Sequence, residues 1–169
     1  VHELLGGKLR DSIRVYSWIG GDRPEDTAKQ ALDAKERGFS AIKMNGPGEL
    51  HWIDDRSKVN RVVENVEAIR EACGEDFGIA VDFHGRVRRP MAKVLMDALH
   101  PYHLMFIEEP LPPESAEEYG RLSARSVTPI AAGERVVTVY DVRPYLEQAA
   151  RGVLQCDVVN CGGFTGARK

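Results

Sequence analysis

The chain has 169 residues, a formal net charge of −3 with neutral histidines, 43% hydrophobic residues and 29% charged residues. This balance is typical of a globular domain and excludes a disordered or collagen-like chain. The sequence has no basic excess to meet phosphates and no apolar run near the roughly 20 residues of a membrane span, so we expect no nucleic-acid partner and no membrane partner.

Short apolar runs rich in β-branched residues alternate with stretches of helical periodicity. Strands are expected at 13–17, 41–44, 78–82, 104–108, 129–132 and 153–159, and helices at 24–37, 90–99, 115–122, 139–150 and along a further apolar stripe at 59–69. Pro24 favours a helix start, and Gly38 and Gly74 favour helix ends. Ser115 and Glu118 have the spacing of a capping box.

Six strand–helix units with continuously apolar strands predict an α/β fold with a parallel sheet that is buried on both faces. Two architectures fit this pattern, namely a doubly wound open sheet and part of a (β/α)8-type barrel. A complete barrel takes about 250 residues. With six strands, a barrel of this length would lack its last two.

The cysteines and the two ends of the chain bear on its origin. Cys73, Cys156 and Cys161 are odd in number and have no paired spacing, which favours buried thiols in a reducing, cytoplasmic compartment. The chain starts at Val1 with no signal peptide, and it stops after Lys169, where a helix would begin. We expect a fragment of a longer protein, with a complete small protein as the alternative.

Three carboxylates lie at or just after the ends of consecutive strands. Glu108 follows Asp82 by 26 residues, and Glu134 follows Glu108 by 26 residues. In a barrel, residues at the carboxyl ends of neighbouring strands meet at one edge, where catalytic groups lie. Three crowded anions repel one another, so the pattern predicts a site for a hard divalent cation, and oxygen ligands suit Mg²⁺.

Several motifs resemble those of a known family. The segments 82–84 (Asp-Phe-His), 107–110 (Ile-Glu-Glu-Pro) and 132–135 (Ala-Gly-Glu-Arg) are similar to strand-end motifs of the mandelate racemase branch of the enolase superfamily. The segments 15–24, 43–46 and 82–86 more closely resemble the galactonate dehydratases of that branch. The resemblance runs along the whole chain. It implies a (β/α)7β TIM-like barrel of which this chain holds about six βα units, with residues 1–12 as the linker into the barrel and residues 13–169 as the incomplete barrel domain.

The resemblance implies a Mg²⁺-dependent dehydratase of a sugar acid, with D-galactonate converted to 2-dehydro-3-deoxy-D-galactonate. The reaction removes a proton next to the carboxylate and eliminates the β-hydroxyl group. Asp82, Glu108 and Glu134 carry over as the metal ligands, whereas Glu109 is expected on the opposite strand face as a structural acid. For the full-length protein we expect a small-molecule sugar acid as substrate and a homo-oligomeric assembly.

Five further residues are candidates for the chemistry. His84 lies two residues after Asp82, so a continuing strand would put both on one face, where the imidazole can protonate the leaving hydroxyl group. The resemblance implies substrate binding by Lys43 and Asn45, and Arg86 is a candidate contact for the polyol. It also implies that Asp157, at the end of the sixth strand, orients a histidine base that lies outside this sequence.

Other functions stay open from the sequence alone. The barrel could serve another acid-sugar dehydratase or a cycloisomerase of the same superfamily. The chain could also be a non-catalytic metal-binding fragment or an interaction module. A phosphate site at Gly162-Gly163, before a helix, is a weaker alternative.

Overall fold

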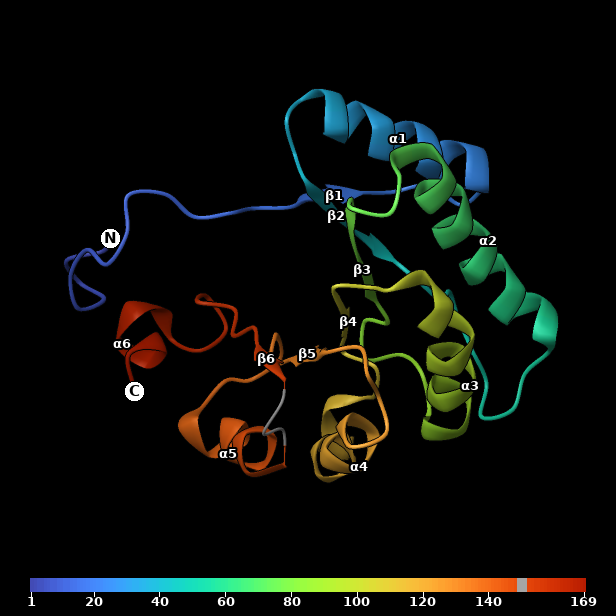
Figure 1. Ribbon diagram of the computed structural model, residues 1–169. Helices are drawn as coiled ribbons and strands as arrows, with labels where there is room; N and C mark the ends of the chain where they lie inside the picture. Colours follow the sequence, from blue (N-terminus) through green and yellow to red (C-terminus); the bar gives the residue numbers. More distant parts are fainter. Residues whose placement is uncertain (149–151) are drawn as a thin grey trace.

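The computed structural model describes residues 1–148 and 152–169, which contain one six-stranded sheet in the order β1-β2-β3-β4-β5-β6 (Figure 1). All five neighbouring strand pairs are parallel. The strands are β1 Ser17–Ile19, β2 Ala41–Asn45, β3 Gly78–Asp82, β4 Phe106–Glu108, β5 Ile130–Ala132 and β6 Val153–Leu154. The α-helices are α1 Pro24–Glu36, α2 Arg56–Cys73, α3 Arg89–Leu99, α4 Tyr119–Ser123, α5 Val139–Gln148 and α6 Gly163–Ala167. Two 3₁₀ helices are η1 His100–Tyr102 and η2 Pro113–Glu118. The predicted α/β fold with about six βα units is confirmed.

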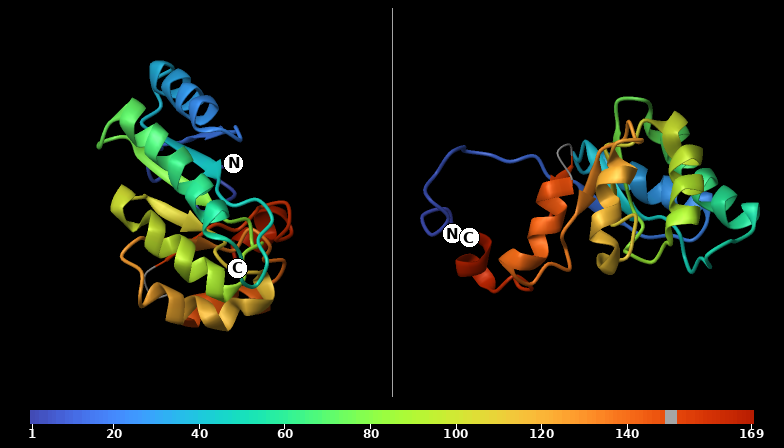
Figure 2. Two further views of the ribbon diagram at one scale, coloured as in Figure 1. Left: turned by 90° about the vertical axis from the view of Figure 1, so that its right-hand side faces the viewer. Right: turned by 90° about the horizontal axis from the view of Figure 1, so that it is seen from below.

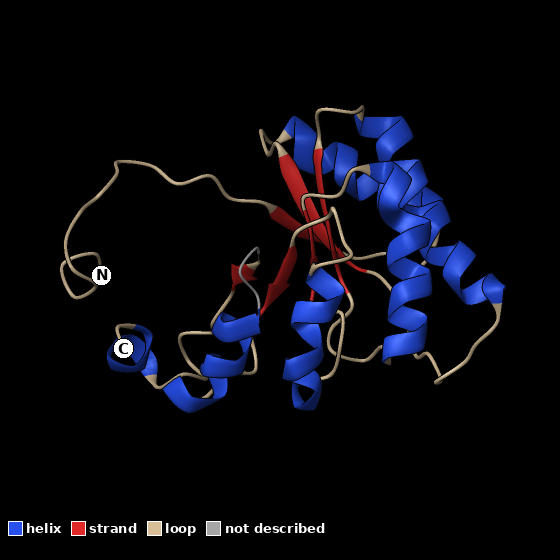
Figure 3. Cartoon of the chain, turned by 60° about the horizontal axis from the view of Figure 1, so that its bottom comes forward, coloured by secondary structure: helices blue, strands red, loops and turns tan. Residues whose placement is uncertain are grey.

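The helices follow one another along the outer face of the sheet. Figure 2 shows α1, α2, α3 and α4 in sequence order beside the strands, and Figure 3 shows the strands inside this row of helices. The N-terminal segment runs on the other side of the sheet from α2 and α3 (Figure 1). This is the arrangement of a partial barrel, in which one face of the sheet packs on helices and the other faces the barrel interior.

Alternate residues of the strands pack against the helices and form the main core. Ile42 and Met44 of β2, Ile79 and Val81 of β3, and Ile107 of β4 are fully buried in this layer. A smaller cluster lies on the inner face, where Ala80, Phe106 and Ala131 pack with Tyr16 and Met105. The period of two places Lys43, Asp82 and Glu108 on this same inner face.

Helix boundaries follow local chemistry. Pro24 occupies the first turn of α1, and Gly38, just after its end, has φ +94°. The stripe of α2 packs inward through Val59, Val62, Val66 and Ile69, and Gly74 ends the helix with φ +87°. Such positive φ angles strain other residues, which is why glycine ends both helices.

The first, fourth and sixth strands differ from the prediction. The first strand was placed at 13–17, but β1 is displaced to Ser17–Ile19 by its pairing with β2. The fourth was placed at 104–108, but β4 begins only at Phe106. The sixth was placed at 153–159, but β6 ends at Leu154, which pairs with Ala132, the last residue of β5. The end of β5 therefore limits β6.

The predicted helix at 115–122 is also corrected. Ser115 is not a helix cap but lies inside the 3₁₀ helix η2 with φ −101°, and α4 begins only at Tyr119. Pro113 in the first turn of η2 starts the tighter helix earlier than the capping-box spacing suggested. The last two residues of the helix predicted at 139–150 lie outside the described residues.

A buried arginine ties α2 to two neighbouring loops. The Arg70 side chain is 7% exposed, and its Nη1 donates hydrogen bonds to the carbonyl oxygens of Gly74, Glu75 and Phe77 at 3.0, 2.9 and 2.7 Å. Its Nη2 donates to the carbonyl oxygen of Tyr102 at 2.8 Å. One side chain thus satisfies four backbone acceptors that connect α2 to β3 and η1 to β4.

We predict that Arg70→Met lowers the free energy of unfolding by about 3 kcal/mol, which corresponds to roughly 6–12 °C in the melting midpoint, because it removes the donor to four backbone carbonyl groups, of which that of Phe77 is buried. Differential scanning fluorimetry measures the shift. Arg61→Met, at an exposed position of the same helix, is the matched control. A midpoint equal to that of the control would show that these four hydrogen bonds do not stabilise the fold.

Candidate metal and active site

Three carboxylates converge at the carboxyl ends of β3, β4 and β5. Asp82 and Glu108 are the last residues of β3 and β4 and pair with each other in the sheet, and Glu134 follows β5 after Gly133. One oxygen of each carboxylate lies within 4.8 Å of those of the other two. Asp82 and Glu108 are 4% and 3% exposed, and Glu134 is half-buried. The structure therefore brings together the three residues that the sequence suggested.

Lys43 reaches the same cluster from β2. Its Nζ donates a hydrogen bond to Oε2 of Glu108 at 2.6 Å and lies 3.6 Å from Oδ2 of Asp82. Burial by itself would lower the pKa of Lys43, but the hydrogen bond and charge of Glu108 outweigh it, and the pKa is raised. Lys43 is therefore a charged group within the cluster, although the sequence suggested contact with substrate alone.

The electrostatics of Glu108 show how crowded the cluster is. Burial is the largest cause of a raised pKa for this carboxyl group, and the negative charges of Asp82 and Glu134 raise it further. The hydrogen bond from Lys43 opposes this shift. One ammonium group leaves two of the three negative charges uncompensated.

The donor set fits a hard divalent cation. The three residues offer only carboxylate oxygens, which are the preferred ligands of Mg²⁺ and similar ions, and no thiol or imidazole is among them. The half-buried position of Glu134 leaves one side of the cluster open. The structure thus supports a divalent-metal site formed by Asp82, Glu108 and Glu134.

His84 lies beside the cluster, but not on a continuing strand as predicted. β3 ends at Asp82, and His84 has a left-handed backbone with φ +58°. The His84 amide donates to Oδ1 of Asp82 at 2.7 Å, which turns the chain and brings Nδ1 within 3.6 Å of Oδ2 of Asp82. Nδ1 is buried and forms no hydrogen bond with any described residue. The imidazole therefore reaches the site through a tight turn.

Of the two other candidate substrate contacts, Asn45 pairs with Asp82 in the sheet, whereas no contact joins Arg86 to the carboxylate cluster among the described residues. Asn45 is the last residue of β2, and Arg86 follows β3. Both line a pocket of about 630 Å³ whose other walls come from the loops after β1 and β2 and from α2. In the part of the chain that the structure describes, neither side chain forms a hydrogen bond with Asp82, Glu108 or Glu134.

Asp157 does not end a strand, because β6 stops at Leu154. Instead Asp157 lies in the following turn, where its Oδ1 accepts hydrogen bonds from the amides of Val159 and Asn160 at 2.7 and 3.2 Å. Asn160 in turn donates from Nδ2 to the carbonyl oxygen of Glu134 at 3.1 Å. The turn that Asp157 organises is thus linked to the loop that carries Glu134.

Glu109 points away from the cluster, as expected, and is 0% exposed. Its Oε1 accepts a hydrogen bond from the Gly133 amide at 2.8 Å, and its Oε2 lies 3.4 Å from Nη1 of Arg135. Burial raises the pKa of Glu109 most strongly, whereas the Gly133 hydrogen bond and the Arg135 charge lower it. The sequence reasoning missed the role of Arg135, for which the only signal was its position directly after Glu134.

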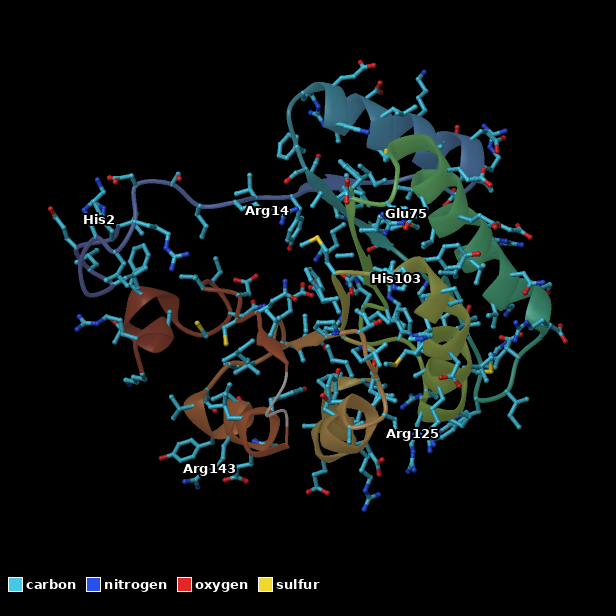
Figure 4. All side chains as sticks on the ribbon, viewed as in Figure 1. His2, Arg14, Glu75, His103, Arg125 and Arg143 are labelled. Atoms are coloured by element: carbon cyan, nitrogen blue, oxygen red, sulfur yellow. The ribbon has the colours of Figure 1, made fainter. Side chains whose placement is uncertain are left out.

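The remaining histidines and the cysteines stay outside the site. His2, His51, His100 and His103 are exposed, and Figure 4 shows His2 in the N-terminal segment away from the sheet. All three cysteines are free thiols, but only Cys73 is buried, so the expectation of buried thiols is wrong for the half-buried Cys156 and Cys161. Among the described helices, none combines the length and apolar character needed to cross a membrane.

We predict that Asp82→Asn, Glu108→Gln and Glu134→Gln each weaken Mg²⁺ binding by at least about tenfold, because each removes one anionic ligand from a site with only three. The triple variant should show no binding in isothermal titration calorimetry. Glu117→Gln, at an exposed acid, is the control. Undiminished Mg²⁺ affinity in the triple variant would disprove the assignment of the site.

Comparisons with known proteins agree with this geometry. A D-galactonate dehydratase of Cronobacter sakazakii is 45% identical over all 169 residues, which correspond to 44% of its length. The structure of a candidate dehydratase from Zymomonas mobilis ZM4 superposes with a TM-score of 0.93 at 30% identity, covering 99% of this chain and 48% of that one. A mandelate racemase/muconate lactonizing enzyme from Jannaschia sp. CCS1 gives a TM-score of 0.88 at 26% identity, covering 98% and 46%.

The chain thus spans less than half the length of these relatives. The family model described as "Enolase C-terminal domain-like" matches residues 26–169, which is most of the chain. On this evidence the chain belongs to the enolase C-terminal domain-like family of the enolase superfamily.

Proposed function

We propose that this chain is the greater part of the barrel domain of a Mg²⁺-dependent sugar-acid dehydratase. The observation that carries the proposal is the convergence of three carboxylates with His84 beside them at one edge of the sheet. The relative named D-galactonate dehydratase supports D-galactonate as the substrate and 2-dehydro-3-deoxy-D-galactonate as the product. Cytoplasmic location and homo-oligomeric assembly belong to the same proposal.

The reaction requires that the proton on the carbon next to the substrate carboxylate become more acidic. A Mg²⁺ ion held by Asp82, Glu108 and Glu134 would supply electrostatic stabilisation of the negative charge that develops on the carboxylate oxygens. The Lys43 ammonium group, 2.6 Å from Glu108, adds a second positive charge at the same place. Asn45 and Arg86 line a pocket formed by the loops after β1 and β2 and by α2, and they are assigned to the hydroxyl groups of the substrate.

His84 is assigned as the general acid. Loss of the β-hydroxyl group as hydroxide is unfavourable, so a proton must reach that oxygen as the C–O bond breaks, and water leaves. Oδ2 of Asp82 lies 3.6 Å from Nδ1 of His84, which leaves the other ring nitrogen for the substrate. The base that removes the α-proton is assigned to a histidine outside these 169 residues, with Asp157 as its orienting partner.

We predict that His84→Asn, in the full-length enzyme, abolishes dehydration but leaves part of the exchange of the α-proton with solvent deuterium. Asparagine removes the acid without removing the metal or the base. Product formation and deuterium exchange, followed by NMR with and without Mg²⁺ over a panel of sugar acids, measure the two steps. His103→Asn, at an exposed histidine, is the control. Equal loss of both steps would contradict the assignment of His84 as an acid only.

We also predict that residues 1–169 expressed alone associate and show no dehydration above background. The strands β1 and β6 form the two edges of the sheet, and open edges favour association. A missing general base typically costs about 10²–10⁴-fold in rate. Light scattering and the same sugar-acid assay test this, with the full-length enzyme for comparison. A monodisperse, active chain would place the base within these residues and would remove the role given to Asp157.

A further inference from the structure

The ion pair between Glu109 and Arg135 connects three strand-end loops behind the metal site. Arg135 Nη1 contacts Oε2 of Glu109 at 3.4 Å, and Arg135 Nη2 donates to the carbonyl oxygen of His84 at 2.8 Å. Oε1 of Glu109 accepts from the Gly133 amide, the residue before Glu134. The pair therefore contacts the turn that holds His84 and the turn that holds Glu134, but neither of their side chains.

The backbone around Glu109 is held from both sides. Glu109 has φ +42°, which is uncommon for a residue other than glycine. Its amide donates to the carbonyl oxygen of Ala131 at 2.9 Å, and its carbonyl oxygen accepts from the Gly85 amide at 2.8 Å. This left-handed turn directs the Glu109 carboxylate away from Glu108, beneath the two loops, where it is fully buried.

Gly85 makes room for the guanidinium group. A Cβ atom built at Gly85 would lie within 2.3 Å of Nη1 of Arg135, and Gly85 has φ +59°. A side chain at this position would displace Arg135 from its contacts with Glu109 and with His84. Glycine at position 85 therefore leaves the space that the Arg135 guanidinium group needs to reach the carbonyl oxygen of His84.

The planar fork of arginine suits this geometry. Its two Nη atoms reach a carboxylate and a carbonyl oxygen at the same time, whereas the single ammonium group of lysine cannot reproduce two fixed directions. A fully buried carboxylate also needs a compensating charge, which Arg135 supplies. Glu109 and Arg135 thus make specific polar contacts and do more than fill space.

We propose that Glu109 and Arg135 are positioning residues that hold His84 in the orientation required for proton donation. This inference rests on the proposed function of His84 as the acid. In Arg135→Lys, the carbonyl oxygen of His84 loses its fixed donor. In Glu109→Gln, the guanidinium group that supplies this donor loses its ion-pair partner. In both variants the left-handed turn of His84 loosens. Glu109→Gln keeps an acceptor for the Gly133 amide, so the loop of Glu134 and the binding of Mg²⁺ stay intact.

Kinetics on the full-length enzyme give the first test. Dehydration should fall by about 10–100-fold in both variants, the usual cost of removing a group that orients a site residue. Exchange of the α-proton and Mg²⁺ affinity should stay close to the parent values. Arg88→Lys is the matched control, because Arg88 forms an exposed pair with Glu114 in the same part of the chain. Unchanged dehydration, or an equal loss of dehydration and of α-proton exchange, would overturn the proposal.

Chemical labelling of histidine gives a second test that does not depend on catalysis. The His84 side chain is 34% exposed, and the four other histidines are exposed and serve as internal references. In both variants, diethyl pyrocarbonate should modify His84 several-fold faster, measured by peptide mass spectrometry, with the reference histidines unchanged. An unchanged rate at His84 would overturn the proposal. If no sugar acid is dehydrated by the parent enzyme but His84 labelling rises as expected, the proposed function fails and the positioning role stands.

Discussion

Repulsion among three carboxylates at one edge of the sheet is the constraint on which the rest of the site depends. Their oxygens lie within 4.8 Å of one another, and at such a distance two like charges near a protein surface repel by about 4 kcal/mol. The parallel register imposes this closeness, because it pairs Asp82 with Glu108 directly. The crowding creates a strong demand for positive charge, which Lys43 meets in part and a divalent cation would complete.

The surrounding structure prevents the crowded carboxylates from moving apart. Residues on the outer face of the same strands, such as Val81 and Ile107, are fully buried against the helices. A shift of either strand by one residue would turn these side chains inward and the carboxylates outward. Packing of the apolar core therefore offsets the electrostatic repulsion among the carboxylates.

The loops after the strands divide the acids into two groups with different tasks. Asp82, Glu108 and Glu134 face a common centre, whereas Glu109 turns away through its left-handed backbone and pairs with Arg135. Neighbouring residues in the sequence thus occupy opposite sides of the site. The arrangement separates the carboxylates that share a common centre from the pair that contacts the loops.

Periodicity and spacing were enough to predict much of this protein. The alternation of apolar strands with helical stripes determined the parallel α/β architecture, because burial of one or both faces of an element sets the spacing of its apolar residues in the sequence. The equal spacing of Asp82, Glu108 and Glu134 placed them at the ends of successive strands. Glu109 was expected on the opposite face of a continuing strand, but it lies beyond the end of β4 and turns away from Glu108 through a left-handed backbone.

Only the tertiary structure decided where strands end and how the loops hold the site. β6 stops where its neighbour β5 ends, and β1 lies at Ser17–Ile19 through its register with β2, so both depend on pairing between distant segments. The left-handed turn at His84 follows the end of β3, and the displacement of Asp157 into a turn follows the end of β6. The contact of Arg135 with His84 joins residues 51 positions apart. Sequence patterns report local periodicity, whereas such contacts arise only when the folded sheet brings separate loops to one edge.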